Sequence, residues 1–485
     1  MNDRIHLGLA VVASPLEVGA DEAPALLERL QEAFVRTSFA GRMEFSMVWE
    51  PVTSPAAAVE AGRRFHDWRV DALCVVAASW FEDYLVLDLL EECDVPAVLW
   101  ARPGMETGSL CGVQQLCFML KQLAHPYCFL FDQVDAQAAL HRAWEFTAAA
   151  ALRRRLRRAR IGYLGHRVEG MTETTAHELA LKKVLGPRVV GIDSQVFLER
   201  AARVPAGSVA ARWEQLKGQV GRVTATDEAG LESLQIYTAM QQVVEEAGLA
   251  AVAVGCYPHL MGKVCLAASL LGEQGVPVAC EGDVNGALGM LMLTELTGQP
   301  VHNTDLLDPI PGENAIVFSH CGSGGFSLAG GRTAVNRRCG EAAVNGRCGE
   351  AAVNGRCWEA AVNGRCGEAA VNRRCWEAVT LAPVRLMERG LCCLFLPRLG
   401  PVTLVNVVPT MDNCRLGVLN GEAVETDMVF PGNPLRVRFA SHYRDVLGWI
   451  VEQGLGHHWM AAYGDLRQPL ADLAAMTGCE CIVHD

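Results

Sequence analysis

The chain has 485 residues, of which 51% are hydrophobic and 20% are charged, and its formal net charge is -13. This composition is typical of a globular protein, and about 440 residues outside a repeated segment are enough for two or three domains. The negative charge argues against nucleic acid and anionic membranes as partners. No segment reaches the roughly 18 apolar residues that a membrane-spanning helix needs.

The first apolar run, "LGLAVVA" at residues 7–13, is short and leads into acidic residues. It therefore predicts a first β-strand rather than a signal peptide. The chain has 19 cysteines, and apolar neighbours flank Cys74 and Cys128, as expected of reduced core residues. Together these features predict a cytoplasmic protein.

Residues 1–157 alternate short apolar runs with amphipathic stretches, which predicts an α/β domain with a mostly parallel sheet. The runs that define it lie at 71–79, 95–101 and 127–132, with a helical pattern at 83–93. A basic run at 152–160 follows another helical pattern. We interpret this run as a solvated helix end and linker, with an anion site as the alternative.

Residues 158–299 repeat the pattern and predict a second doubly wound α/β domain. Strand-like runs at 160–167, 188–193, 250–256 and 276–280 alternate with helical stretches. From residue 300 the sequence pattern changes to short runs of β-branched residues separated by Gly and Pro. Residues 300–485 therefore predict an antiparallel barrel-like or sandwich domain that closes with a helix and a strand.

A nonapeptide repeat occupies residues 334–378 of this third domain. Its five copies place one cysteine each at Cys339, Cys348, Cys357, Cys366 and Cys375. A step of nine residues puts neighbouring thiols on opposite sides of a helix or strand, and zinc sites of the usual Cys-x2-4-Cys spacing are absent. The repeat favours a tandem expansion of a surface loop over its alternative, a zinc-binding or oligomerisation module.

The acids Glu281 and Asp305 lie in the most informative stretch, "VPVACEGDVNGALGMLMLTELTGQPVHNTDLLD". Glu281 comes directly after a buried strand, at the carboxyl end of a parallel sheet, where α/β proteins build sites. Each acid also has a structural explanation. Glu281 or Asp283 can cap the following helix, and Asp305 can occupy a turn.

This stretch, with "AIVFSHCGSGGFSLA" and "GLGHHWMAAYGDLRQPLADLAAMTG" after it, resembles the L-fucose isomerase and L-arabinose isomerase family. The resemblance runs from about residue 158 to the end of the chain. It implies two α/β domains, a C-terminal β-barrel-like domain, and a manganese-dependent aldose-ketose isomerase that forms homo-oligomers. Co2+ and Mg2+ are the possible substitutes for Mn2+. The repeat has no counterpart in the family pattern.

The resemblance places the metal ligands at Glu281, Asp305 and His458. His320 is a candidate fourth ligand, because the arabinose branch uses such a histidine and the fucose branch lacks it. Isomerisation through an enediol needs a Lewis acid for the two sugar oxygens and an acid and a base beside them. Glu281 and Asp305 are the catalytic candidates, and which of them takes the proton stays open.

Further residues are candidates for substrate binding: Trp80, His457, Cys321 and Ser323. Trp80 is equally explained as a packing residue, Asp283 and Asn285 as helix caps, and His259 is a weaker site candidate at another strand end. The substrate is a free or modified sugar. Two alternatives to the isomerase remain, a non-catalytic sugar-binding or regulatory protein and a metal-dependent sugar epimerase.

Overall fold

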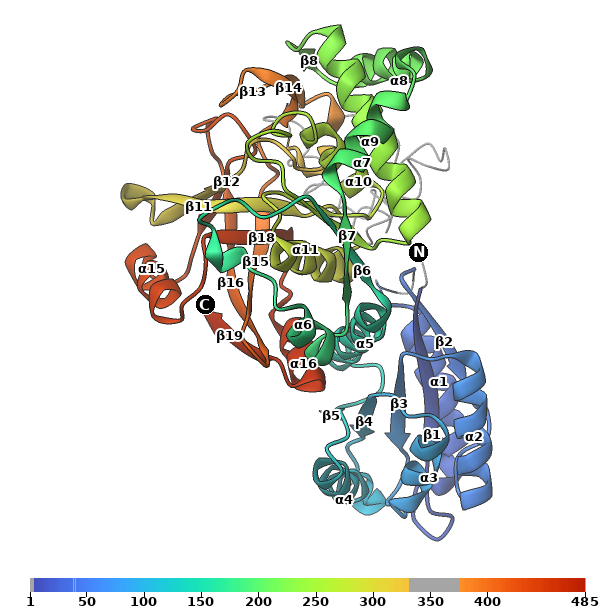
Figure 1. Cartoon of the computed structure of the whole chain (residues 1–485). Helices are drawn as coiled ribbons and strands as arrows, with labels where there is room; N and C mark the ends of the chain where they lie inside the picture. The colour runs from blue at the N-terminus through green and yellow to red at the C-terminus, as the bar shows by residue number, and fades with distance from the viewer. Residues whose placement is uncertain (1–3, 38, 40, 331–374, 485) are drawn as a thin grey trace. The chain divides into compact units, whose positions relative to one another are not determined.

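The computed structural model describes residues 4–37, 39, 41–330 and 375–484. The chain divides into two compact units, one formed by 1–155 with 468–477 and the other by 156–467 with 478–485 (Figure 1). None of the helices in the described ranges is long and apolar enough to cross a membrane.

The first unit is built on a five-stranded parallel sheet in the order β2-β1-β3-β4-β5. Its strands are β1 (Ile5–Val12), β2 (Met43–Met47), β3 (Ala72–Ala77), β4 (Ala97–Ala101) and β5 (Tyr127–Phe131). The predicted first strand is confirmed as β1. Every residue of β3 and β4 is buried, as expected for central strands covered on both faces. Cys74 and Cys128 are buried free thiols.

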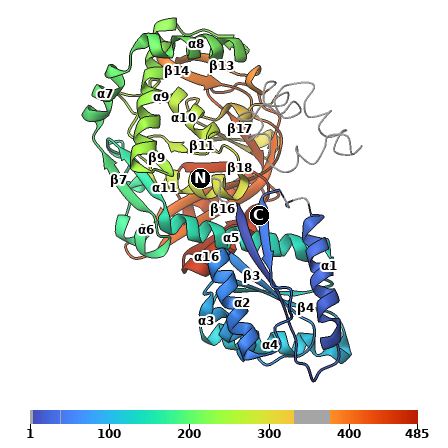
Figure 2. The same cartoon turned by 90° about the vertical axis from the view of Figure 1, so that its right-hand side faces the viewer.

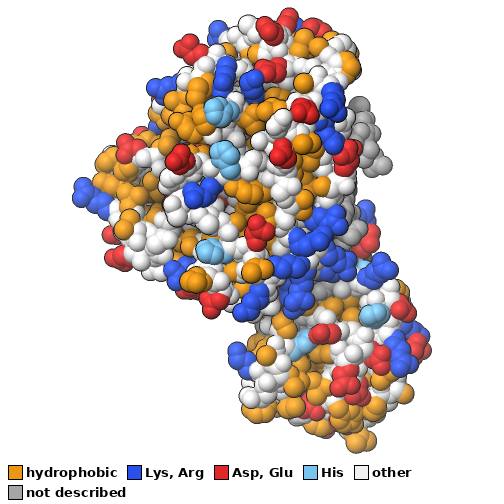
Figure 3. Space-filling view, in the orientation of Figure 1, with side chains coloured by type: hydrophobic (Ala, Val, Ile, Leu, Met, Phe, Trp, Pro, Cys, Tyr) orange, Lys and Arg blue, Asp and Glu red, His pale blue; other side chains and the backbone are white. Residues whose placement is uncertain are grey.

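Helices connect these strands, and the C-terminal α16 also belongs to this unit. They are α1 (Ala23–Val35), α2 (Pro55–Trp68), α3 (Tyr84–Glu92), α4 (Ser109–Gln122), α5 (Gln137–Arg158) and α16 (Arg467–Thr477). Arg142 of α5 forms a two-pronged ion pair with Asp472 of α16. The basic run forms the end of α5, as predicted, and the division between the two units falls within it, between Arg155 and Leu156. Lys and Arg side chains gather over α5 in Figure 3.

The second unit begins with a four-stranded parallel sheet in the order β10-β9-β6-β7. Its strands are β6 (Arg160–Leu164), β7 (Arg188–Ile192), β9 (Ala251–Val254) and β10 (Val278–Ala279). The helices between and after them are α6 (Glu178–Val184), α7 (Ser194–Arg203), α8 (Ala206–Gln219), α9 (Asp227–Ala247), α10 (Cys265–Glu273) and α11 (Val284–Thr297).

A closed six-stranded antiparallel barrel follows, in the order β15-β18-β11-β12-β17-β16, with β16 returning to β15. Its strands are β11 (His302–Ile310), β12 (Ala315–Ser319), β15 (Gly400–Pro409), β16 (Cys414–Val424), β17 (Leu435–Arg438) and β18 (His458–Tyr463). Helix α15 (Tyr443–Glu452) precedes β18, and β19 (Glu480–His484) pairs parallel with β16. The predicted fold class, two α/β sheets followed by a β-barrel, is confirmed.

Helix α11 joins the sheet to the barrel, because it starts after β10 and packs against β15 and β18 (Figures 1 and 2). Its residues are buried almost all round, which explains its apolar sequence. Glycines at 286 and 289 face the Met460 side chain of β18, so the helix approaches the barrel closely. Both the start of α11 and the start of β18 are thereby fixed near one another.

A small sheet in the order β14-β13-β8 completes the unit, with β8 (Arg222–Val223), β13 (Thr380–Val384) and β14 (Arg389–Leu394). Most of the nonapeptide repeat lies outside the described residues, which include only its last four positions, 375–378. Trp376 there packs edge to face on Phe326, with ring centroids 4.6 Å apart.

Candidate metal centre

Glu281 stands on a sharp turn immediately after β10. Its φ is +62°, a left-handed conformation that is uncommon for residues other than glycine and often marks functional positions. The turn is held by backbone bonds from Val168 N to Glu281 O, at 3.2 Å, and from Gly282 N to Val254 O, at 2.9 Å. These contacts place the carboxylate at the carboxyl edge of the parallel sheet, as the sequence predicts.

Asp305 and His458 come together through the barrel register. Asp305 lies inside β11, not in a turn, and is directly opposite His458 of the antiparallel strand β18. Directly opposed side chains on one face lie close enough to interact. Strand pairing therefore unites two residues that are 153 positions apart in the sequence.

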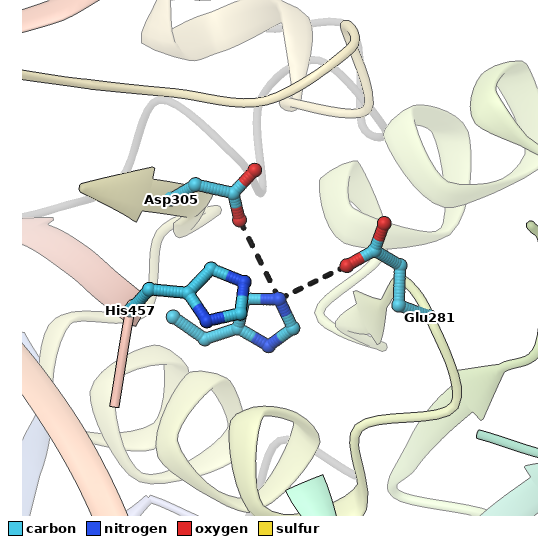
Figure 4. Close-up of side chains that lie close together, drawn as sticks. Glu281, Asp305 and His457 are labelled. Carbon is cyan, nitrogen blue, oxygen red and sulfur yellow. Dashed lines mark hydrogen bonds and ion pairs between the residues drawn. The ribbon is translucent and has the colours of Figure 1, made fainter. Parts of the chain in front are cut away.

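The two acids approach one nitrogen of His458. Glu281 Oε2 lies 3.0 Å and Asp305 Oδ1 lies 3.5 Å from His458 Nε2. Figure 4 shows these two carboxylates reaching the same imidazole from different sides, with His457 beside it. Ligand atoms of Glu281, Asp305, His457 and His458 all lie within 4.8 Å of one another, so this group could hold a metal ion.

Asp283 binds the second ring nitrogen of His458, a role that the sequence did not predict. It occupies the N-cap position of α11 but makes no capping hydrogen bond with its side chain. Instead, Asp283 Oδ2 accepts a bond from His458 Nδ1 at 2.9 Å, which leaves Nε2 directed at Glu281 and Asp305. A carboxylate behind a histidine is the usual support of a metal-ligating imidazole.

His457 has a comparable partner, Glu173, with which its Nδ1 forms a close ion pair. Glu173 belongs to a 3-10 turn at Thr172–Thr174, on the segment that follows β6. Both side chains are more exposed than His458, which is only 6% exposed, against 38% for His457 and 44% for Glu173. His457 therefore lies at the open side of the group.

The charges around His458 favour a positive centre. Burial lowers the pKa of this imidazole, but bonds and charges from Asp283 and Glu281 outweigh burial and raise it to about 10. Burial acts to raise the pKa of Glu281, yet His458 and the neighbouring histidines hold it below its usual value. Carboxylates arranged in this way stabilise either an imidazolium or a bound cation.

His320 lies beside this group. Its Nε2 is 3.8 Å from Asp305 Oδ1, and its Nδ1 accepts a bond from the Cys321 backbone N at 3.0 Å. Burial opposes the protonation of His320, but the charges of Asp305 and Cys280 raise its pKa well above the ordinary value. Its role as a fourth ligand stays a prediction, since the four-residue group does not include it.

The remaining candidates are more scattered. Cys321 is half-buried with Sγ 3.1 Å from His320 Nδ1, and Ser323 is buried within 3.6 Å of the Cys280 thiol. Asn285 bonds through its amide N to Thr175 O rather than capping the helix. His259 is exposed after β9. Trp80 belongs to the first unit, where its backbone N bonds to Thr107 O, and its sugar contact stays a prediction.

Comparison with known proteins gives relatives of one kind. The chain is 24% identical over 433 residues to the sulfoquinovose isomerase of Priestia megaterium (strain ATCC 12872 / QMB1551), covering 86% of both chains. It is 24% identical over 417 residues to that of Alkalicoccus urumqiensis, covering 84% of both. No model of a protein family matches the chain.

Among solved structures, an Agrobacterium vitis ABC transporter solute-binding protein with bound D-fucose aligns with 51% of this chain and 76% of its own. The identity is 12% and the TM-score is 0.16, which is too low to carry an argument.

The isomerase relatives support an isomerase enzyme that acts on a sugar, and the prediction of an enzyme of this class is confirmed. The resemblance to L-fucose and L-arabinose isomerases is supported as far as a sugar isomerase.

Proposed function

We propose that the protein is a metal-dependent aldose-ketose isomerase acting on a modified hexose through an enediol. The proposal rests on the convergence of two carboxylates on one imidazole. Glu281 Oε2 lies 3.0 Å and Asp305 Oδ1 lies 3.5 Å from His458 Nε2. The relatives that align over more than four fifths of the chain are named sulfoquinovose isomerase. Sulfoquinovose, a hexose with a sulfonate group, is therefore the first substrate to test.

The residues present fit a divalent cation. Asp305 Oδ1 is buried and accepts no hydrogen bond from any described residue, so it is available as a ligand. Carboxylates with an imidazole suit Mn2+, and also Co2+ and Mg2+. Glu281, Asp305 and His458 would hold the ion, with His457 or His320 as an additional ligand. When bound, the cation would polarise the two sugar oxygens and stabilise the negative charge of the enediolate.

The protein's own groups would manage the protons. Glu281 and Asp305 approach the same nitrogen of His458 from different directions. One of them would remove the proton from the carbon beside the carbonyl, and the other, when protonated, would protonate the carbonyl oxygen. Return of the first proton to the former carbonyl carbon and removal of the proton on the second oxygen would complete the ketose. Asp283 would keep the His458 ring in the orientation that leaves Nε2 toward the reaction. His457, paired with Glu173 at the open side, is suited to hydrogen-bond the sugar.

Two further properties belong to the same proposal. A cytoplasmic enzyme agrees with buried free thiols such as Cys74 and Cys128, because reducing compartments preserve thiols. A homo-oligomer is expected from the resemblance to sugar isomerases. Epimerisation through the same enediol remains the second candidate, since it would use the same acid and base.

The test is proton exchange in D2O. Protein stripped of metal and reloaded with Mn2+ is incubated with sulfoquinovose and a panel of neutral aldoses, and NMR follows ketose formation and deuterium at C1 or C2. We expect label and ketose only in the presence of metal. Glu281→Gln should reduce the rate at least about a hundredfold, because losing a general base removes 10²- to 10⁴-fold of catalysis.

Glu313→Gln is the matched control, since Glu313 pairs with Arg436 on the outside of the barrel. An epimeric aldose without ketose would favour the epimerase. The absence of bound metal in the wild-type protein would sink the proposed site.

A further inference from the structure

The loop after β6 crosses directly over the turn that carries Glu281. A Cβ added at Gly282 would lie 2.6 Å from His166 O and 2.7 Å from the Arg167 Cα, and one at Gly255 would lie 2.2 Å from His166 O. Glycines at both strand ends are therefore required for this crossing. The loop and the Glu281 turn form one packed unit, and Arg167 is placed beside the site by backbone contacts.

Arg167 itself is well anchored at its backbone but not neutralised at its side chain. Its backbone N donates to the Tyr163 hydroxyl at 2.7 Å, and its carbonyl receives a bond from His166 Nδ1 at 2.8 Å. The guanidinium makes one long bond, at 3.3 Å, to Val168 O. In the described part of the chain it has no carboxylate partner, whereas Arg200, Arg415 and Arg436 each pair with a glutamate.

The packing of the loop thus places a half-buried arginine, with no carboxylate partner among the described residues, next to the turn that carries Glu281. Glu281 and Asp283 direct their carboxylates at His458. Apart from its bond to Val168 O, the Arg167 guanidinium has no hydrogen-bond partner among the described residues, so most of its donors are free. Arginine presents a planar fork that matches oxyanions such as sulfonate and phosphate. A neutral sugar would gain little from this group, but a sugar with an anionic substituent would gain a charge-assisted contact.

We propose that Arg167 is the residue that recognises an anionic group on the substrate, at the end of the sugar far from the reacting carbonyl. This inference rests on the proposed function and extends it by naming the substrate class, an aldose bearing a sulfonate or a phosphate. The acids at the metal centre act on C1 and C2, and Arg167 selects the sugar by its opposite end.

The test compares kcat and KM of wild type, Arg167→Met and Arg167→Lys for four sugars. Sulfoquinovose and D-glucose 6-phosphate supply the two anions, and D-quinovose and D-glucose are the neutral partners. We expect Arg167→Met to lower kcat/KM for the preferred anionic sugar about 10- to 100-fold, mainly through KM, and to leave neutral sugars unchanged. Lysine should restore part of the loss, because it keeps the charge without the fork.

Arg188→Met is the matched control, because Arg188 is exposed at the amino end of β7, the end of the sheet away from Glu281. Which of the two anions is preferred by the wild type distinguishes sulfonate from phosphate. Equal losses for neutral and anionic sugars would show a structural role and overturn the proposal, as would no loss at all.

The failure of the proposed function has a separate signature. If the wild-type protein turns over none of these sugars, saturation-transfer NMR measures binding alone. Preference for an anionic over a neutral sugar that disappears in Arg167→Met would still support anion recognition. Binding without such a preference would overturn it.

Discussion

His302 is a buried titratable residue whose environment gives the protein a specific sensitivity to acid. It is 1% exposed in β11, and neither ring nitrogen has a hydrogen-bond partner among the described residues. Burial, followed by the charge of Arg398, lowers its pKa to about 3. The folded protein thus keeps this ring neutral over a pH range in which an unfolded histidine becomes protonated.

The sign of the effect follows from linkage. Above about pH 6.5 the ring is neutral in both the folded and the unfolded protein, so it does not change the free energy of unfolding. As the pH falls from there toward 3, only the unfolded chain takes up the proton, and this favours unfolding. The free energy of unfolding should therefore fall by up to roughly 2 kcal/mol between pH 6.5 and 5 from this group alone. His302→Leu should flatten that decline, measured by urea unfolding at pH 7.5 and pH 5.

The exposed His259 supplies the comparison for this experiment. His259→Leu should keep the wild-type dependence on pH. If His302→Leu and His259→Leu show the same decline as wild type, His302 is not the source of the acid sensitivity.

The residues of the candidate metal centre were predictable from sequence to different degrees. Glu281 could be placed because a strand and a helix flank it, and the family resemblance added Asp305 and His458. Asp283 was interpreted only as a cap, because its bond to His458 joins positions 175 residues apart. Nothing local in the sequence signals such a pair, and the same holds for Glu173 with His457.

At the scale of elements, α11 shows how a helix can tune the site without contributing a ligand. Gly286 stands in its first turn, where an added Cβ would lie 2.6 Å from Asp283 Oδ2 and 2.7 Å from Met460 Cε. Both of these are ends of flexible side chains, so they can move at small cost. The movement of Asp283 would, however, weaken its support of His458.

We therefore expect Gly286→Ala to change stability by less than about 1 kcal/mol, since the gain in helix propensity offsets the displacement. Metal affinity should fall about tenfold, as for other losses of support behind a ligating histidine. Calorimetric titration with Mn2+ and thermal unfolding measure the two quantities on the same samples.

Gly272 in α10 provides the matched substitution, because nothing lies within 4 Å of its added Cβ. Gly272→Ala should stabilise the protein by about 0.5–1 kcal/mol and leave metal affinity unchanged. Equal metal affinities for the two variants would show that Asp283 does not support the site through α11.

At the scale of the whole molecule, the sequence predicted the classes of element better than their closure. Alternating apolar and amphipathic runs predict the two parallel sheets, and short β-branched runs predict an antiparallel third part. Whether these strands form a sandwich or a barrel depends on which strands pair at a distance. Closure comes from β18, which pairs with both β11 and β15, and such pairing is not written in any local pattern.

The described flanks of the nonapeptide repeat make its removal a test of the whole architecture. Ala329 forms a bridge with Pro397 before the repeat, and Trp376 packs on Phe326 at its end. Both flanks are thus held in the second unit, and a short Gly-Ser linker can replace residues 334–374. All four residues of the metal-binding group lie outside the deleted segment.

The deletion should keep stoichiometric Mn2+ binding, deuterium exchange and the oligomeric state, because the barrel strands and the site are supplied by the rest of the chain. Metal analysis, the D2O assay and light scattering read these three properties. Glu281→Gln within the shortened chain should abolish exchange, which ties the remaining activity to the same site. Loss of metal or of assembly on deletion would instead support the alternative in which the repeat is a zinc-binding or oligomerisation module.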